Sequence, residues 1–156
     1  SGFHTTIVTS DLDLLQLVNP VTEVEVFSQY WETRLFDVES TAWRFDGLAP
    51  GNIPDYKALV GDTSDNLPGV PGIGDVSATA VLRKYGNLDK VYGDLDAISE
   101  LPFRGAKRVS RLLAEHREQA FLMRTLTTIV CDVPVDVDID GALIEESVLK
   151  DTHRLP

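Results

Sequence analysis

The sequence has a single cysteine, Cys131, and no apolar run approaching the roughly 18 residues that a membrane span needs. One cysteine excludes an internal disulfide and a zinc site built from several cysteines, so Cys131 is expected to be a small buried apolar side chain. The first residues also lack the charged and then apolar pattern of a signal peptide. We therefore expect a soluble, cytoplasmic protein with no membrane partner, and 156 residues with 43% hydrophobic content suffice for a buried core.

Basic residues are scarce relative to acidic ones, with 14 Lys and Arg against 25 Asp and Glu and a formal net charge of −11. Because nucleic-acid binding depends on Lys and Arg, this balance is weak evidence against a DNA partner. However, ten of the fourteen basic residues lie between Lys57 and Arg124, and carboxylates gathered around a metal ion make a chain look more acidic than its working surface. We expect DNA affinity to require divalent metal and low salt.

The most informative stretch runs from Leu59 to Gly74 and joins two acidic residues to a turn rich in glycine and proline. Asp62 and Asp65 have a spacing that can bring two carboxylates to one face, and Mg²⁺ is held by one or two carboxylates together with waters and phosphates. The following Pro-Gly-Ile-Gly turn has the spacing of a helix-hairpin-helix, in which glycines let backbone N–H groups approach a phosphate at a helix N-terminus. A connector that is merely rich in turn residues is the alternative, but the length of the motif favours the functional interpretation.

A second acidic pair, Asp11 and Asp13, follows the β-branched run Thr5–Thr9, which predicts a strand leading into a helix that Ser10 or Asp11 caps. Ligands of open α/β sheets bind beyond the carboxyl ends of strands, where both aspartates would lie. The alternatives are a plain helix cap for Asp11 and a first-turn carboxylate for Asp13. Taken alone, the pair leaves these interpretations open, and it also occurs in metal-dependent sugar transferases.

The rest of the chain predicts short strands and helices. Trp43 and Phe45 are expected in the core. A looser repeat of the hairpin leads into a basic segment in which Arg104, Lys107, Arg108 and Arg111 would either meet phosphates or form a solvated face. We expect strands at 21–28 and 124–131, helices at 38–45, 54–60 and 77–85, and an edge strand or extended acidic tail at 133–140.

Three segments, Thr9–Leu17, Ile53–Gly74 and Arg117–Ile129, resemble the bacterial 5′–3′ exonucleases of the flap-endonuclease family. That family includes the 5′-nuclease domain of DNA polymerase I and free-standing relatives, and the likeness runs from about Gly2 to Asp138. It implies an α/β fold: the C-terminal part of a PIN-like 5′-nuclease with a helix-hairpin-helix (helix-3-turn-helix) subdomain. The expected division is nuclease core at 1–60, DNA-binding region at 61–125, and terminal strand with acidic tail at 126–156.

The resemblance also implies the site and its chemistry. Two Mg²⁺ or Mn²⁺ ions would hydrolyse DNA phosphodiesters at 5′ flaps or ends, in a protein fused to or acting with a DNA polymerase. K⁺ would bind the carbonyls of Val70 and Ile73 in the hairpin. The implied metal-binding and catalytic residues are Asp11, Asp13, Asp62 and Asp65, and the implied DNA-binding residues are Gly72, Gly74, Ser77, Arg83, Lys84, Lys107 and Arg108.

Two substitutions depart from the family pattern, since Leu12 and Val76 stand where a lysine is common. Both remove a positive charge near the phosphates and should weaken DNA binding. The family's other catalytic acids and its helical arch would precede Ser1, so we expect the chain to be the C-terminal half of the nuclease and inactive by itself. The alternative is a non-catalytic helix-hairpin-helix module that binds DNA.

Overall fold

A computed structural model describes residues 2–28 and 32–142. At one end lies a three-stranded sheet of order β1-β2-β3, with β1 (Thr5–Thr9) parallel to β2 (Thr22–Phe27) and β3 (Thr33–Phe36) antiparallel to β2. The short 3₁₀ helix η1 (Leu12–Leu17) connects β1 to β2. Apolar residues on one face of the sheet pack against η1 and against Ile53. Together these residues form the sheet core, which consists of Leu15, Val18, Val24, Phe36 and Ile53.

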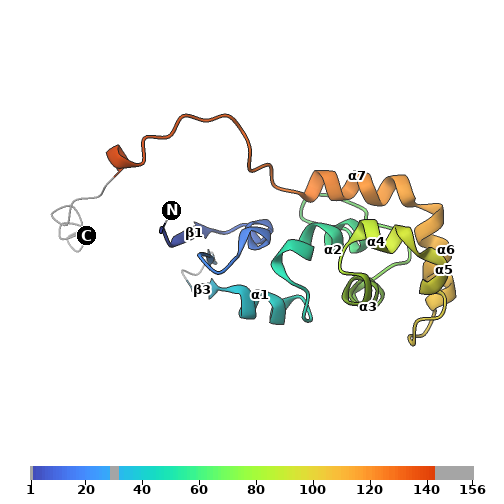
Figure 1. Ribbon diagram of the computed structural model, residues 1–156. Helices are drawn as coiled ribbons and strands as arrows, with labels where there is room; N and C mark the ends of the chain where they lie inside the picture. The colour runs from blue at the N-terminus through green and yellow to red at the C-terminus, as the bar shows by residue number, and fades with distance from the viewer. Residues whose placement is uncertain (1, 29–31, 143–156) are drawn as a thin grey trace.

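The remaining elements are helices, and Figure 1 shows α3 to α7 gathered at the end of the molecule opposite the sheet, with α2 between. Their buried residues form a second, helical core that includes Leu59, Leu82, Leu88 and Leu113. The elements are α1 (Val38–Arg44), η2 (Pro50–Asn52), α2 (Ile53–Val60), α3 (Asp75–Tyr85), α4 (Leu88–Gly93), α5 (Leu95–Ile98), α6 (Ala106–Glu115), α7 (Arg117–Thr127) and η3 (Asp140–Ala142).

Helix α2 joins the two cores. Pro54 near its start suits a first helical turn, where the missing N–H costs nothing. Ile53 at its beginning belongs to the sheet core, whereas Ala58 and Leu59 near its end belong to the helical core. The expected helices at 38–45, 54–60 and 77–85 are confirmed to within two residues at each end. The structure therefore carries the end of α2 directly into the stretch that contains Asp62.

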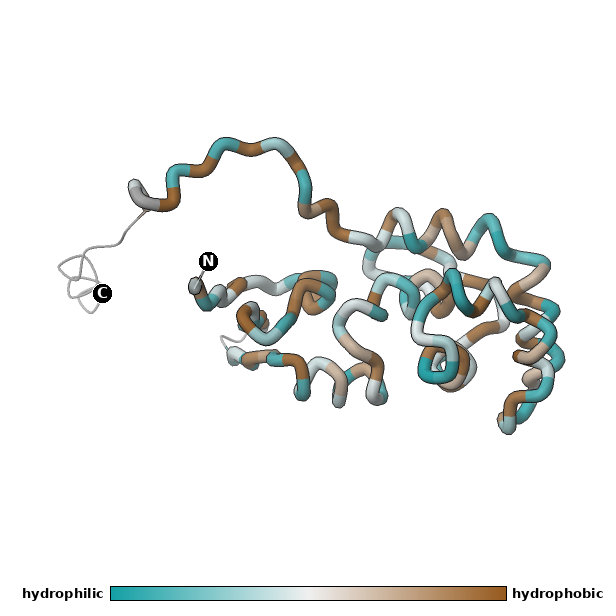
Figure 2. Tube along the Cα trace, viewed as in Figure 1, coloured by the Kyte–Doolittle hydropathy of each residue, from teal (hydrophilic) through white to brown (hydrophobic). Residues whose placement is uncertain are grey.

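The strand expected at 124–131 is wrong, because α7 continues to Thr127. Ala120, Met123 and Thr127 recur on one buried face at helical spacing, and the Thr127 hydroxyl donates to the carbonyl of Met123 at 3.0 Å. Beyond α7 the chain runs extended without a strand partner among the described residues. Of the two expectations for 133–140, the extended tail therefore agrees with the structure and the edge strand does not. Figure 2 shows apolar and polar residues alternating along this tail.

Two predicted core residues lie at the surface instead. Trp43 is 75% exposed on α1, whose one buried residue is Thr41, and its ring lies beside the guanidinium of Arg34. Cys131 is exposed because it falls in the extended tail rather than in a strand. Phe45, by contrast, packs against both cores. Within residues 2–28 and 32–142, no helix has the length and apolar character to span a membrane.

Candidate metal centre and hairpin

Three carboxylates converge between the sheet and α2. Asp13 comes from η1, whereas Asp62 and Asp65 follow the end of α2, and one oxygen from each lies within 4.8 Å of the others. Asp13 and Asp62 are half-buried, and Asp65 is exposed. Carboxylate oxygens are the donors that hard divalent cations prefer, so this group suits Mg²⁺ or Mn²⁺.

Asp11 stands outside this group. Its carboxylate accepts a hydrogen bond from the backbone N–H of Asp13 at 2.8 Å and caps η1, as the capping interpretation predicted. It lines the same open cleft as the three convergent aspartates. Its assignment as a metal ligand stays a prediction.

The cleft itself is acidic and has a volume of about 710 Å³. Five aspartates line it against two basic side chains, which leaves a formal charge of −3. A cleft lined by one sign of charge concentrates counter-ions, here cations. The charged lining residues are Asp11, Asp13, Asp62, Asp65, Asp75, Arg44 and Lys57.

Lys57 is a site residue that the sequence interpretation missed. Its ammonium pairs with both Asp13 and Asp62, at 2.5 Å from Asp62 Oδ2, and its side chain is only 12% exposed. The sequence does show a lysine in the last turn of the helix before Asp62, and this is the feature that could have indicated Lys57. That signal does not reveal the contact with Asp13, because η1 is distant in the chain.

Asp62 is held from both sides. Lys57 donates to Oδ2, while the backbone N–H of Ser64 donates to Oδ1 at 2.9 Å and the Ser64 hydroxyl contacts the same oxygen. Burial by itself would raise the pKa of Asp62, but the hydrogen bonds from Lys57 and Ser64 outweigh it and lower the pKa to about 2. Asp62 is therefore ionised at neutral pH.

The loop that carries Asp62 and Asp65 is closed by backbone contacts. Asp62 and Leu67 exchange two N–H···O bonds of 2.8 and 2.7 Å, and the N–H of Val70 donates to the carbonyl of Leu59 at 2.8 Å. Gly61 and Gly69 cross so closely that a Cβ on Gly69 would lie 2.3 Å from the Gly61 nitrogen. This closure brings the start of the hairpin next to the end of α2.

The hairpin turn follows immediately. The N–H of Ile73 donates to the carbonyl of Val70 at 3.1 Å, and the N–H groups of Ser77 and Ala78 both donate to the carbonyl of Gly74, the N-cap residue of α3. Gly72 has φ +81°, and a Cβ there would lie 2.6 Å from an Arg108 guanidinium nitrogen. Arg108 of α6 thus rests against the turn.

The other predicted DNA-binding cations are more scattered. Lys107 is exposed on α6 and Lys84 is exposed in the last turn of α3. Arg83 is engaged elsewhere, since it pairs with the carboxylate of Asp46 at 3.0 Å. The structure therefore brings Arg108, rather than Arg83, to the hairpin.

A hydrogen bond links α2, which carries Lys57, to α3, the helix that follows the hairpin turn. The hydroxyl of Tyr56, the neighbour of Lys57 in α2, donates to Asp75 in the first turn of α3 at 2.9 Å. Tyr56 packs edge-on against Phe45. Its burial, and to a smaller extent its hydrogen bond to Asp75, raise its pKa to about 12. Tyr56 therefore stays protonated and able to donate.

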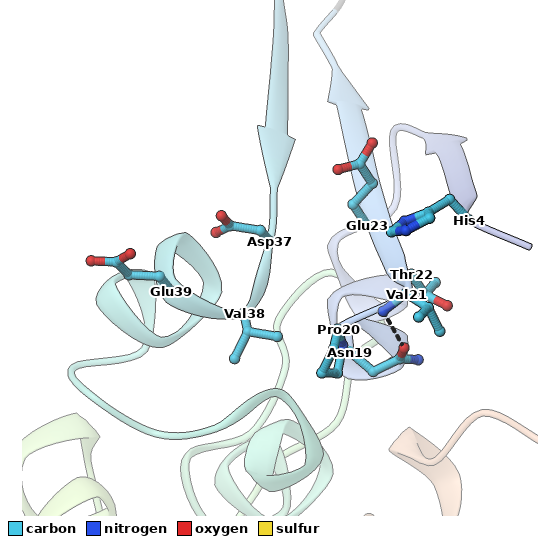
Figure 3. A pocket seen from close by; sticks show the side chains of 9 residues that line it. All are labelled: His4, Asn19, Pro20, Val21, Thr22, Glu23, Asp37, Val38 and Glu39. Atoms are coloured by element: carbon cyan, nitrogen blue, oxygen red, sulfur yellow. Dashed lines mark hydrogen bonds between the residues drawn. The ribbon is translucent and has the colours of Figure 1, made fainter. Parts of the chain in front are cut away.

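Another hollow, of about 410 Å³, lies at the base of the sheet (Figure 3). It also contains acidic side chains, but Figure 3 shows the carboxylates of Asp37 and Glu39 pointing away from His4 and Glu23. Asp37 is used to cap α1, accepting from the N–H of Ser40 at 2.8 Å. Among the described residues, the group that converges on a metal position is the one at Asp13, Asp62 and Asp65.

Several known proteins are similar to this chain. A family model described as 5′-3′ exonuclease, C-terminal SAM fold, matches residues 48–148. The DNA polymerase I of Chloroflexus aurantiacus is 42% identical over 146 residues, which cover 92% of this chain and 15% of that protein. A 5′-3′ exonuclease of Buchnera aphidicola from Acyrthosiphon pisum is 30% identical over 149 residues, covering 96% of this chain and 51% of its own length.

A solved structure of T5 5′-exonuclease, with divalent zinc ions bound, superposes with a TM-score of 0.60 and 25% identity. The match covers 80% of this chain and 42% of that one. The chain thus spans about half the length of the free-standing exonucleases it matches and a smaller share of the polymerases. The resemblance predicted from the motifs is confirmed, and this chain belongs to the 5′-3′ exonuclease family, of which it carries the C-terminal SAM fold.

Proposed function

We propose that this chain is the C-terminal part of a structure-specific 5′–3′ exonuclease or flap endonuclease that hydrolyses DNA phosphodiesters with divalent metal ions. The observation that carries the proposal is the convergence of Asp13, Asp62 and Asp65 in an acidic cleft, close to a hairpin turn in which Gly72 and Gly74 are exposed. Membership of the exonuclease family and the metal-bearing T5 structure support it. DNA with 5′ flaps or ends is the proposed substrate, and a linked or associated DNA polymerase is the proposed partner.

Asp13, Asp62 and Asp65 would hold a Mg²⁺ or Mn²⁺ ion, and Asp11, in the same cleft, would contribute to a second ion. Bound there, the metal would supply an activated water and stabilise the attacking and leaving oxygens of the phosphodiester. Asp62 is suited to this role because its low pKa keeps it ionised.

The hairpin would hold duplex DNA through its backbone, which gives selection by structure rather than by base sequence. Amides at Gly72 and Gly74 would face a phosphate, with K⁺ at the carbonyls of Val70 and Ile73 and charge from Arg108. The closed loop and the hydrogen bond from Tyr56 to Asp75 would keep the hairpin at a constant separation from Asp62. That separation would determine which phosphodiester reaches the metal.

Catalysis would require more residues than these. The chain spans about half of its exonuclease relatives, and three convergent carboxylates do not supply a complete two-metal cluster. We expect the isolated chain to leave a labelled 5′-flap duplex uncut in the presence of Mg²⁺.

The metal centre is tested by calorimetric titration of the chain with Mn²⁺. We expect Asp62→Asn and Asp65→Asn each to weaken binding by about tenfold or more, because each removes a charged ligand. Asp89→Asn, at an exposed aspartate of α4 outside the cleft, serves as the control and should leave Mn²⁺ binding unchanged. Unchanged affinity in both ligand variants would contradict the metal centre and favour the second candidate, a non-catalytic helix-hairpin-helix module.

The hairpin is tested separately by Gly72→Ala. The new Cβ meets the Arg108 guanidinium at 2.6 Å, and a left-handed alanine costs about 1–2 kcal/mol, so the turn and its cation should both shift. We expect affinity for a fluorescent 5′-flap duplex, read by anisotropy at low salt, to fall by about tenfold, a loss of roughly 1.4 kcal/mol.

Gly93→Ala is the control for the hairpin variant, since Gly93 lies in α4, outside the hairpin, and a Cβ there has nothing within 4 Å. It should bind DNA as the unchanged chain does. A Gly72→Ala protein with native circular dichroism and undiminished DNA affinity would show that the hairpin is not the DNA anchor.

A further inference from the structure

Lys57 lies in a position that the proposed metal chemistry does not explain. Its ammonium contacts two of the three carboxylates that form the candidate metal centre, and only 12% of its side chain is exposed. A buried ammonium requires paired acceptors, which Asp13 and Asp62 provide. The lysine and a divalent ion would therefore compete for the same oxygen atoms.

We propose that Lys57 is a resident counter-cation of the metal centre, holding Asp13 and Asp62 together before a divalent ion binds and leaving at least one of them when the ion enters. This inference rests on the proposed metal site. It follows that the site binds metal more weakly than the same three carboxylates would without the lysine.

The need for such a cation comes from the carboxylates themselves. Three carboxylates with oxygens within 4.8 Å repel one another when they carry charge, and the repulsion is larger in a partly buried site than in water. Arg44, the other cation of the cleft, lies over the ring of Phe45 at 6.0 Å and has no ion pair with these aspartates in the described part of the chain. Neutralisation of the metal-free centre therefore falls to Lys57.

The arrangement also indicates how an ion would enter. Both oxygens of Asp62 are engaged, one by Lys57 and one by Ser64, whereas Asp65 is exposed and has no ion pair among residues 2–28 and 32–142. An incoming ion would first meet Asp65 and then take the oxygens that Lys57 holds. The open cleft of about 710 Å³ and the flexible four-carbon stem of lysine leave room for the ammonium to move aside.

Replacing Lys57 by methionine, which keeps an unbranched apolar stem, separates the charge from the packing. We expect Lys57→Met to bind Mn²⁺ about tenfold more tightly than the unchanged chain, because the ion no longer displaces an ammonium. In chelator its melting temperature should fall, and added Mn²⁺ should raise that temperature by more than in the unchanged chain. Lys90→Met, at an exposed lysine of α4, is the control and should change neither quantity.

Equal or weaker Mn²⁺ affinity in a folded Lys57→Met protein would overturn the inference while leaving the metal centre in place. Absence of binding by both proteins would overturn the metal centre and the inference together.

A measurement on the unchanged chain covers the case in which Lys57→Met does not fold. The ¹³Cε–¹H signal of Lys57, assigned with a Lys57→Arg variant, should move towards the signals of exposed lysines as Mg²⁺ binds. A Lys57 signal that stays constant while calorimetry records Mg²⁺ binding would overturn the inference.

Discussion

Alanine at Gly69 is expected to cost about 4 kcal/mol or more of folding free energy, a large share of the roughly 5–15 kcal/mol that stabilises an ordinary domain. The new Cβ would lie 2.3 Å from the Gly61 nitrogen and 2.5 Å from the Val60 carbonyl carbon, which are backbone atoms that cannot rotate away. Gly69 also has φ +60°, where an L-residue costs about 1–2 kcal/mol. Moving the two segments of the loop apart would also break the hydrogen bond from the N–H of Val70 to the carbonyl of Leu59.

Gly86→Ala is the matched control for this prediction. Gly86 has φ +86° but nothing within 4 Å of an added Cβ, so alanine there should cost only the left-handed penalty of about 1–2 kcal/mol. Urea unfolding followed by circular dichroism measures both variants. A Gly69→Ala protein as stable as Gly86→Ala would show that the loop opens without penalty and does not position Asp62 and Asp65.

The second large effect is expected at Asp55, which joins α2, α4 and α7. Its buried carboxylate accepts from the backbone N–H of Leu88 at 3.0 Å and faces Arg124 at 3.8 Å. Burial raises the pKa of Asp55, against the opposing effects of the Leu88 hydrogen bond and of Arg124. Asp55→Ala would leave the first N–H of α4 unpaired and should cost about 3 kcal/mol.

Asp89→Ala tests whether this cost comes from burial, because Asp89 pairs with the same arginine at 2.5 Å but is exposed. An exposed pair of this kind contributes little to stability, because solvent screens it. Urea unfolding at pH 7 should therefore show a much smaller loss of stability for Asp89→Ala than for Asp55→Ala. Equal losses would mean that Asp55 acts only through Arg124 and does not hold α4.

The two incorrect predictions, the strand at 124–131 and the core position of Trp43, have a common cause. The segment at 124–131 is rich in β-branched residues, yet its first residues continue the helical spacing of Ala120, Met123 and Thr127, and packing against α2 outweighs the local preference. Trp43 was placed in the core by its apolar character, but α1 buries little besides Thr41. The local composition of a helix or strand does not determine which of its faces packs against the rest of the protein.

The sequence by itself determined the features whose physics is local. Caps, turn residues and short-range spacing located α1, α2 and α3, the pair Asp62 and Asp65, and the glycine turn of the hairpin, because backbone conformation within a few residues decides each of them. Local pattern also pointed to Asp11 and Asp13, and the family resemblance assigned both of them to the metal site with that pair.

Only the tertiary structure decided which distant groups meet. Packing of the sheet core against α2 brings Asp13 to Asp62 and Asp65, excludes Asp11 from their group, and places Lys57 among them. Packing of α6 in the helical core likewise brings Arg108 to Gly72. These contacts join residues far apart in the chain, and the burial of apolar surface that creates them is a property of the whole fold rather than of any one segment.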